Sequence, residues 1–260
     1  METLRYKDLP KLPANIMILG RCGSGKSSIL YSLISEGYTY GKGKKSIFDE
    51  GIVYLGTQDA ISAFEKLPIK NHIVLQEFDP DDFEEYLDDL KSHQMEKLSR
   101  KKAPMNTIII FDDFVGQSLM KHNKGKASPL ERLALTSRHE CNATIVFCSQ
   151  VYKNSGFSHP VVRNNITTYI LSQMSRPEIE KIAEELSGDM TPEEFIQLYD
   201  KIMAKQRYNF MVYDTRRPLD MRWTERFTIP IERPERLKML YKNRNGKEVT
   251  ADNGSGEDSE

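Results

Sequence analysis

The sequence predicts an α/β fold of three layers, in which a mainly parallel sheet lies between two layers of helices. Short apolar segments alternate with helical segments along most of the chain, as expected for strands joined by crossover helices. Polar groups follow three apolar segments directly, namely the glycine-rich run 20–27, Asp112-Asp113 and Gln150. Because the carboxyl ends of parallel strands meet at one edge of a sheet, we expect a ligand site there.

Composition favours a globular protein with one main domain. The 260 residues are 38% hydrophobic and 29% charged, with a formal net charge of −1, so any nucleic-acid contact must come from local basic clusters. No apolar run is long enough for a membrane span, and the N-terminus lacks the apolar core of a signal peptide. We expect a lead-in at 1–13, a domain at 14–241 and a disordered polar, acidic tail at 242–260.

Cysteine usage predicts a reducing, intracellular environment. Cys22, Cys141 and Cys148 cannot all pair with one another, and their spacing is not that of a metal site. We expect Cys141 and Cys148 to be small core residues.

The run 20–27 matches the P-loop (Walker A) pattern G-x-x-x-x-G-K-[ST], between an apolar strand and an amphipathic helix. We expect its glycines to adopt positive φ, Lys26 to reach the β- and γ-phosphates, and Ser27 to ligate Mg²⁺. The alternative is a glycine-rich turn that contains a lysine by chance, and the match of both flanks argues against it. The predicted nucleotide-binding residues are Gly20, Arg21, Cys22, Gly23, Ser24, Gly25, Lys26, Ser27 and Ser28.

The remaining elements follow from apolar periodicity and from proline and glycine positions. The predicted strands are 15–19, 51–56, 72–76, 106–111, 144–150 and 167–171, with a terminal β-ribbon formed by 208–213 and 221–227. Helices are predicted from Lys26 to about 36–37, in a short connection before 72, from Asp79 to about 102, and at 129–139, 177–186 and 192–204. We expect 38–50 and 114–128 to be basic loops.

Two consecutive carboxylates, Asp112 and Asp113, end the strand that begins at Asn106. Downstream of a P-loop, this pattern is typical of the second strand of a nucleotide site. We expect Asp112 to hold Mg²⁺ through water and Asp113 to orient or deprotonate the attacking water. The acidic residues that follow Asp79 are instead expected to form a solvated helix start.

A resemblance to a known family rests on three further segments, which are Glu131 to His139, the strand that ends in Gln150, and 161–165. Together with the P-loop and the Asp-Asp strand, they resemble the genome-packaging ATPases of poxviruses and other large DNA viruses, in the FtsK and HerA branch of P-loop motors. The resemblance covers roughly residues 14–215. It implies a RecA-like P-loop NTPase fold.

The same resemblance implies further roles. Gln150 is similar to the polar sensor of the γ-phosphate, and Arg138 or Arg163 to the arginine finger that enters a neighbouring subunit's site. Alternatively, Gln150 satisfies backbone groups at a strand end, and the two arginines form ordinary surface ion pairs. Bacterial members of the branch usually carry Asp-Glu in place of Asp112-Asp113 and have a separate DNA-reading domain. The terminal β-ribbon and the tail have no counterpart that we can map.

The sequence thus favours an ATP-hydrolysing motor that moves double-stranded DNA into a viral capsid as a homo-oligomeric ring, with ATP and Mg²⁺ as cofactors. Expected partners are duplex DNA, bound without sequence preference through the basic clusters 42–45, 121–126 and 216–226, and capsid or portal-vertex proteins. The expected location is the host cytoplasm, in the viral factory, and the virion. Two alternatives are a helicase or replication initiator, and a nucleotide-binding capsid component without turnover.

Overall fold

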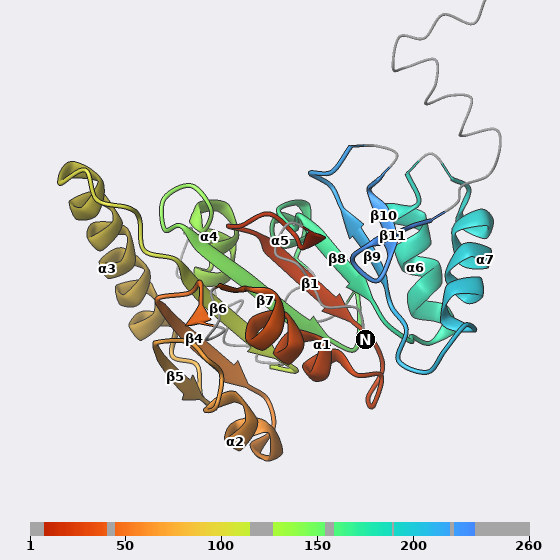
Figure 1. Ribbon diagram of the computed structural model, residues 1–260, viewed down its shortest axis with the longest axis horizontal. Helices are drawn as coiled ribbons and strands as arrows, with labels where there is room; N and C mark the ends of the chain where they lie inside the picture. The colour runs from red at the N-terminus through yellow and green to blue at the C-terminus, as the bar shows by residue number, and fades with distance from the viewer. Residues whose placement is uncertain are drawn as a thin grey trace, which may run out of the picture.

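A nine-stranded sheet organises the described part of the computed structural model (Figure 1). The structure describes residues 8–40, 45–114, 127–153, 159–188, 190–218 and 221–231. The strand order is β11-β10-β9-β8-β1-β7-β6-β4-β5. The strand for the P-loop, β1, therefore lies between β7 and β8, near the middle of the sheet.

Six neighbouring strands are parallel, as the alternation of strands and helices predicted. They are β5 (Asn71–Leu75), β4 (Glu50–Leu55), β6 (Thr107–Asp112), β7 (Ala143–Ser149), β1 (Asn15–Leu19) and β8 (Thr168–Leu171). The predicted ribbon is confirmed as β9 (Met211–Asp214) and β10 (Trp223–Glu225), which pair antiparallel. It extends the main sheet, because β9 pairs with β8 and β11 (Ile229–Pro230) pairs with β10.

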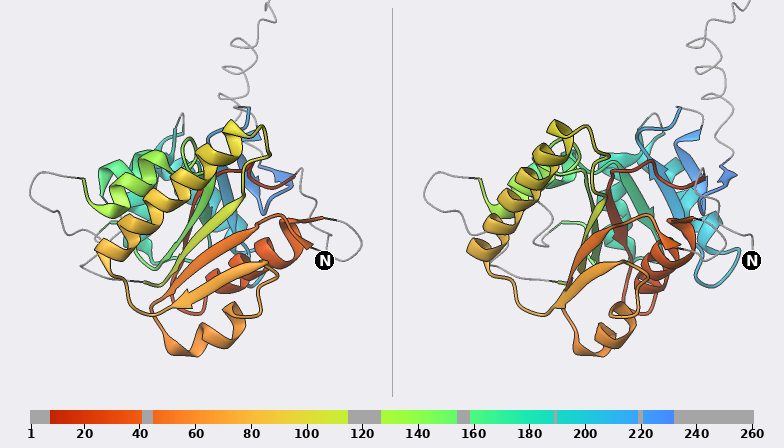
Figure 2. Two further views of the ribbon diagram at one scale, coloured as in Figure 1. Left: turned by 90° about the vertical axis from the view of Figure 1, so that its left-hand side faces the viewer. Right: turned by 60° about the vertical axis from the view of Figure 1, so that its left-hand side comes forward.

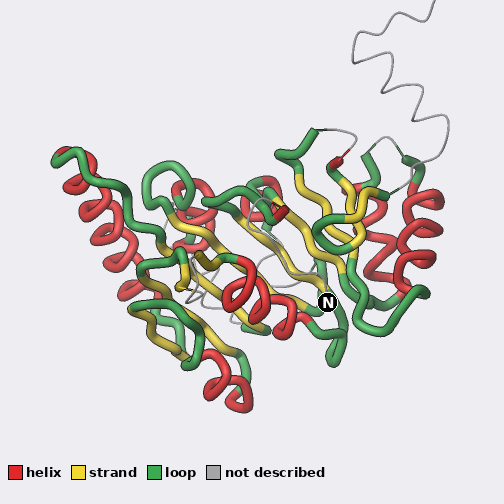
Figure 3. The backbone as a smooth tube through the Cα atoms, viewed as in Figure 1, coloured by secondary structure: helices red, strands yellow, loops and turns green. Residues whose placement is uncertain are grey.

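The helices as far as α5 lie between successive strands of the parallel part, and α6 and α7 follow β8 (Figure 3). A π-helix, Leu33–Gly37, continues α1 as far as the predicted stop at glycine, and a 3₁₀ helix, Gln58–Ala60, precedes α2. The α-helices are α1 (Lys26–Ser32), α2 (Ile61–Phe64), α3 (Pro80–Ser99), α4 (Pro129–Thr136), α5 (Pro160–Asn164), α6 (Arg176–Leu186) and α7 (Pro192–Met203).

Alternate residues of β1 belong to two separate cores, which makes the fold three-layered. Met17 and Leu19 pack in one core with α3, α4, α6 and α7, whereas Ile16 and Ile18 pack in the other with α1 and α2. Figure 2 shows the strands between α3 and α4 on one side and α1 and α2 on the other. The continuous burial of β1, β6, β7 and β8 is that of a parallel sheet covered on both faces.

Local capping explains where several helices begin. Asp79 accepts hydrogen bonds from the backbone N–H groups of Asp81 and Asp82 at the start of α3, so these acids form the expected helix start. A capping box joins Ser128 and Glu131 at the start of α4, and an equivalent one begins α7. Each of these three helices has proline in its first turn.

Three local predictions need correction. Part of the predicted loop 38–50 forms a hairpin of β2 (Thr39–Tyr40) and β3 (Lys45–Ser46), because Tyr38 and Phe48 are buried against each other with ring centres 5.7 Å apart. Helix α4 ends at Thr136 rather than at 139. The helix α5 was not predicted at all.

The predicted lead-in packs against the domain where it is described. Leu9 is buried in the α1 core, and a Cβ on Gly37 would overlap its side chain. The hydroxyl of Tyr38 donates a hydrogen bond to the carbonyl oxygen of Pro10 at 3.0 Å. Residues 8–13 are thus packed onto the domain, while 1–7 and the predicted tail 242–260 lie outside the described residues.

Candidate functional site

The P-loop leaves the carboxyl end of β1 and begins α1. Gly23 and Gly25 have φ angles of 72° and 93°, the left-handed conformations predicted for this loop. Gly20 is needed for a different reason: a Cβ on it would overlap the hydroxyls of Ser24 and Ser172. The loop therefore requires glycine twice for its backbone angles and once for close packing.

Residues that follow β8 support the P-loop from the side. The hydroxyls of Ser24 and Ser172 lie 2.8 Å apart, and the Ser172 hydroxyl also donates to the carbonyl oxygen of Leu19 at 3.0 Å. Arg21 binds Gln173 twice, through its backbone N–H at 2.9 Å and its guanidinium at 2.7 Å. Ser172 and Gln173 were not identified from the sequence, because nothing local marks a residue that contacts a loop so far away along the chain.

Lys26 and Ser27 join the P-loop to the end of β6. The Lys26 side chain is buried, and its Nζ lies 3.5 Å from Oδ2 of Asp113 and 3.5 Å from the carbonyl oxygen of Arg21. The Ser27 hydroxyl donates a hydrogen bond to Oδ2 of Asp112 at 2.9 Å. Ser27, Ser28 and the loop residues 21–23 are exposed, so a ligand has access to this edge.

Asp112 provides the test of whether the site fits Mg²⁺. Its carboxylate is buried at 5% exposure, and Oδ1 has no hydrogen-bond partner among the described residues. Burial raises the pKa of Asp112, while the hydrogen bond from Ser27 opposes that rise. A free carboxylate oxygen beside a serine hydroxyl is a hard-oxygen donor set of the kind that Mg²⁺ takes together with nucleotide phosphates. The described residues hold no cluster of three or more His, Cys, Asp or Glu arranged for a metal.

Asp113 is in contact with both Lys26 and Gln150. The amide of Gln150 donates a hydrogen bond to Oδ2 of Asp113 at 3.3 Å, the same oxygen that Lys26 faces. Asp113 has a φ of 46°, which is unusual for a residue other than glycine and is often found at functional sites. The structure thus brings together five of the residues predicted from the sequence: Lys26, Ser27, Asp112, Asp113 and Gln150.

Gly56 was not predicted to have a role, and it lies directly behind Asp113. A Cβ on Gly56 would overlap the backbone carbonyl of Asp113, and the Gly56 N–H donates to the carbonyl oxygen of Asp112 at 3.0 Å. Its position after β4 was visible in the sequence, but its partner depends on β4 lying beside β6.

Neither candidate arginine finger has a contact with the P-loop among the described residues. Arg138 precedes β7, whose seven residues rise about 3.3 Å each, so it lies about 20 Å from the Gln150 end. Burial lowers the pKa of Arg216, and the charge of Arg138 nearby lowers it further. Arg163 is mostly buried, 3.7 Å from Glu185 and with its guanidinium 5.4 Å from the ring centre of Tyr152.

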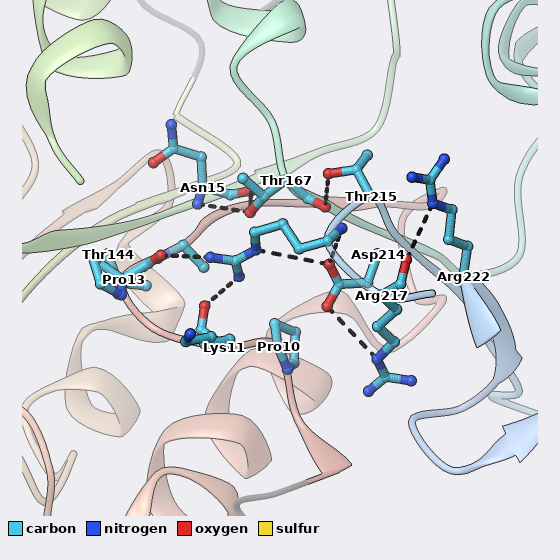
Figure 4. Close-up of polar contacts among 12 residues, drawn as sticks. Pro10, Lys11, Pro13, Asn15, Thr144, Thr167, Asp214, Thr215, Arg217 and Arg222 are labelled. Carbon is cyan, nitrogen blue, oxygen red and sulfur yellow. Dashed lines mark hydrogen bonds and ion pairs between the residues drawn. The ribbon is translucent and has the colours of Figure 1, made fainter. Parts of the chain in front are cut away.

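In the predicted DNA-binding cluster 216–226, the described arginines make intramolecular contacts, several of which are drawn in Figure 4. Arg216 donates to the carbonyl oxygens of Lys11 and Pro13, the latter at 2.8 Å, and Arg217 donates to that of Asp8. Both arginines face the buried carboxylate of Asp214. These arginines hold the lead-in against the sheet. The cluster 121–126 and most of 42–45 lie outside the described residues, apart from the exposed Lys45.

The fold and this site define a P-loop nucleoside triphosphatase. The chain belongs to the Poxvirus A32 protein family, whose sequence model matches residues 1–216. This membership confirms the resemblance expected from the sequence. The comparison with curated proteins gives no match.

Solved structures with the same fold include two P-loop ATPases. One is B204, the DNA-packaging ATPase of Sulfolobus Turreted Icosahedral Virus, with a TM-score of 0.51 and 16% identity over 78% of this chain and 93% of that one. The other is EssC (ATPases 2 and 3) from Geobacillus thermodenitrificans, with a TM-score of 0.55 and 13% identity over 92% of this chain and 43% of that one. At these identities the likeness shows the fold alone, and it confirms the predicted three-layer P-loop architecture.

Among the described residues, none of the helices has the length and apolar composition of a membrane span.

Proposed function

We propose that the chain is an ATP-hydrolysing motor that packages double-stranded DNA into a viral capsid. The observation that carries the proposal is the convergence of Lys26, Ser27, Asp112, Asp113 and Gln150 at the carboxyl edge of one sheet. Membership of the poxvirus family and the fold shared with the packaging ATPase B204 support it. The motor acts as a homo-oligomeric ring with capsid or portal-vertex proteins, in the viral factory of the host cytoplasm and in the virion.

Within this proposal, the P-loop binds the triphosphate. Backbone N–H groups freed by the left-handed glycines face the phosphates, and the ammonium of Lys26 neutralises the β- and γ-phosphates. Lys26 is already held at the mouth of the loop by Asp113 and the Arg21 carbonyl. Nucleotide binding exchanges the Asp113 carboxylate for phosphate oxygens as the partner of Lys26.

Ser27 and Asp112 are the residues that would hold Mg²⁺, the serine by its hydroxyl and the aspartate through water. The ion supplies charge neutralisation at the phosphates when it is bound. The hydrogen bond between Ser27 and Asp112 keeps both groups oriented in its absence.

Asp113 and Gln150 act at the γ-phosphate end. Once Lys26 turns to the phosphate, the Asp113 carboxylate is free to accept a proton from the attacking water, or to orient it. The Gln150 amide, 3.3 Å from the same carboxylate, reports the presence of the γ-phosphate by changing its hydrogen-bond partner. An arginine from a neighbouring subunit then stabilises charge that develops in the transition state.

The experiment measures ATP binding and phosphate release by the wild-type chain and by Lys26→Ala, with and without Mg²⁺. The proposal expects Mg²⁺-dependent hydrolysis by the wild type and loss of tight ATP binding by the variant. Hydrolysis by Lys26→Ala at the wild-type rate would contradict it. If assembled wild-type protein binds ATP but does not hydrolyse it even with duplex DNA, the result would instead favour a nucleotide-binding capsid component without turnover.

A further inference from the structure

An exposed tyrosine lies against the P-loop from the far end of the chain. A Cβ placed on Gly25 would lie 3.4 Å from Cδ1 of Tyr208 and 3.9 Å from its Cβ and Cγ. Tyr208 is 52% exposed, and the guanidinium carbon of the exposed Arg207 lies 4.8 Å from the centre of its ring. The ring therefore borders both the nucleotide loop and solvent.

The backbone of Tyr208 is strained and firmly held. Its φ angle is 61°, in the left-handed region that bulky residues rarely adopt. The next residue, Asn209, is buried, and its side-chain amide donates to the carbonyl oxygen of Ile202 at 2.8 Å and to Oε1 of Glu225 at 2.9 Å. These hydrogen bonds hold the backbone in place just before β9. A glycine would fit this backbone with less strain, and strained backbone of this kind is common at ligand-binding positions.

The strand order shows which part of a nucleotide reaches Tyr208. Asp113 and Gln150 follow β6 and β7, which lie on one side of β1, and the proposed function assigns this side to the γ-phosphate. With that assignment, the rest of the nucleotide extends to the other side, toward β8 and β9. Tyr208 lies just before β9, whose first residue, Met211, pairs with the last residue of β8 at this same edge. Strands lie about 4.8 Å apart, so β9 is about 10 Å from β1.

We propose that Tyr208 binds the base of the nucleotide, with the purine ring stacked on the phenol ring in the place that the Arg207 guanidinium takes in this structure. The guanidinium is itself a planar group on an aromatic face, so the surface has the right form for a planar base. This inference rests on the proposed function, since it requires a nucleotide in the P-loop.

The test compares two ligands that differ in the base. Isothermal titration calorimetry measures binding of ATP and of inorganic tripolyphosphate, each with Mg²⁺, to the wild type, Tyr208→Ala and Tyr208→Phe. Stacking of one base on an aromatic side chain is worth enough for a ten- to hundredfold change in affinity. We expect Tyr208→Ala to lose ATP affinity by about that factor and to bind tripolyphosphate as the wild type does. Tyr208→Phe keeps the ring and should bind both ligands normally.

Tyr40→Ala is the matched control, because Tyr40 is also an exposed tyrosine, at 59%, on the β2–β3 hairpin beyond the far end of α1. It should bind ATP as the wild type does. Unchanged ATP affinity in Tyr208→Ala would overturn the inference while leaving the proposed function intact. An equal loss of ATP and tripolyphosphate binding would also overturn it, because the contact would then be with phosphate. Failure of the wild type to bind ATP would instead overturn the proposed function.

Tyr208→Gly separates a binding role from a structural one. Glycine relieves the left-handed strain, so thermal unfolding should occur at the wild-type temperature or above it. ATP affinity should still fall by about the same factor as in Tyr208→Ala. A lower unfolding temperature with unchanged ATP affinity would show that the ring serves only the fold.

Discussion

The backbone carbonyl of Asp113 occupies the space that a Cβ on Gly56 would take. Asp113 also has a φ of 46°, so its carboxylate depends on a backbone position that the end of β4 defines. Gly56→Ala should therefore displace the carboxylate without altering the P-loop. We expect phosphate release to fall about a hundredfold, as for other small displacements of a catalytic group, with ATP affinity nearly unchanged.

Gly188→Ala is a suitable control for Gly56→Ala. Gly188 has a φ of 64°, so alanine strains its backbone, but a Cβ there meets nothing within 4 Å. It should lower the unfolding temperature and leave turnover per folded molecule unchanged. If Gly56→Ala hydrolyses ATP at the wild-type rate, the position of Asp113 does not depend on Gly56.

Asp113→Asn should separate binding from chemistry. The amide keeps the size of the side chain but cannot accept a proton, so ATP binding should persist while hydrolysis falls at least about a hundredfold. Nucleotide binding and phosphate release on the same preparation measure the two effects. Hydrolysis at the normal rate would mean that another acid positions the water.

Asp112→Asn should stabilise the nucleotide-free protein. The buried Oδ1 has no described hydrogen-bond partner and burial raises the pKa of the carboxyl, so the ionised group destabilises the fold. Removing the charge should therefore raise the melting temperature, and in a chain of this length each 1 kcal/mol of added stability raises it by about 2–4 °C. The variant should also lose the extra stabilisation that Mg²⁺ adds to ATP, and thermal melts with ATP in EDTA or in Mg²⁺ measure both effects. If Mg²⁺ and ATP stabilise the variant as much as the wild type, the assignment of Asp112 to the Mg²⁺ site is contradicted.

Arg217→Ala should weaken the fold rather than DNA binding. The guanidinium holds carbonyl oxygens of Asp8 and Phe227 and faces the buried Asp214, so its loss leaves polar groups unpaired. We expect a loss of about 1–3 kcal/mol in the free energy of unfolding. Lys45→Ala, which removes an exposed lysine on β3, should leave stability unchanged. An unchanged melting temperature for Arg217→Ala with reduced DNA stimulation would restore this cluster as a DNA contact.

The candidate fingers can be separated by mixing subunits. Arg138→Ala should bind ATP normally and be nearly inactive, and mixing it with Lys26→Ala subunits should restore some hydrolysis, because a finger acts in trans on transition-state charge. Arg163 is held by Glu185 and Tyr152, so Arg163→Ala should also lower stability. Recovery only in the Arg163→Ala mixture would make Arg163 the finger, and no recovery in mixed rings would contradict a trans mechanism.

The sequence predicted what is encoded locally. The P-loop, the strand that ends in Asp112-Asp113 and the strand that ends in Gln150 are continuous segments, and parallel-sheet geometry alone brings their ends together. The residues that the sequence did not reveal act across long separations. Ser24 and Ser172 are 148 positions apart, and Tyr208 reaches Gly25 only because β9 joins the sheet beyond β8. The sequence also could not show that the arginines after Asp214 bind internal carbonyl oxygens, because charge alone does not distinguish a ligand contact from an internal one.

The most direct test of the motor is the steady-state rate of phosphate release by assembled wild-type protein, measured with and without duplex DNA over a range of salt concentrations. The account predicts that duplex DNA of any sequence raises the rate more than single-stranded DNA does. The stimulation should decline as salt rises, because phosphate contacts release counterions. A rate that is indifferent to duplex DNA at low salt, in protein shown to be assembled, would contradict the motor, and stimulation by single strands alone would point to a helicase.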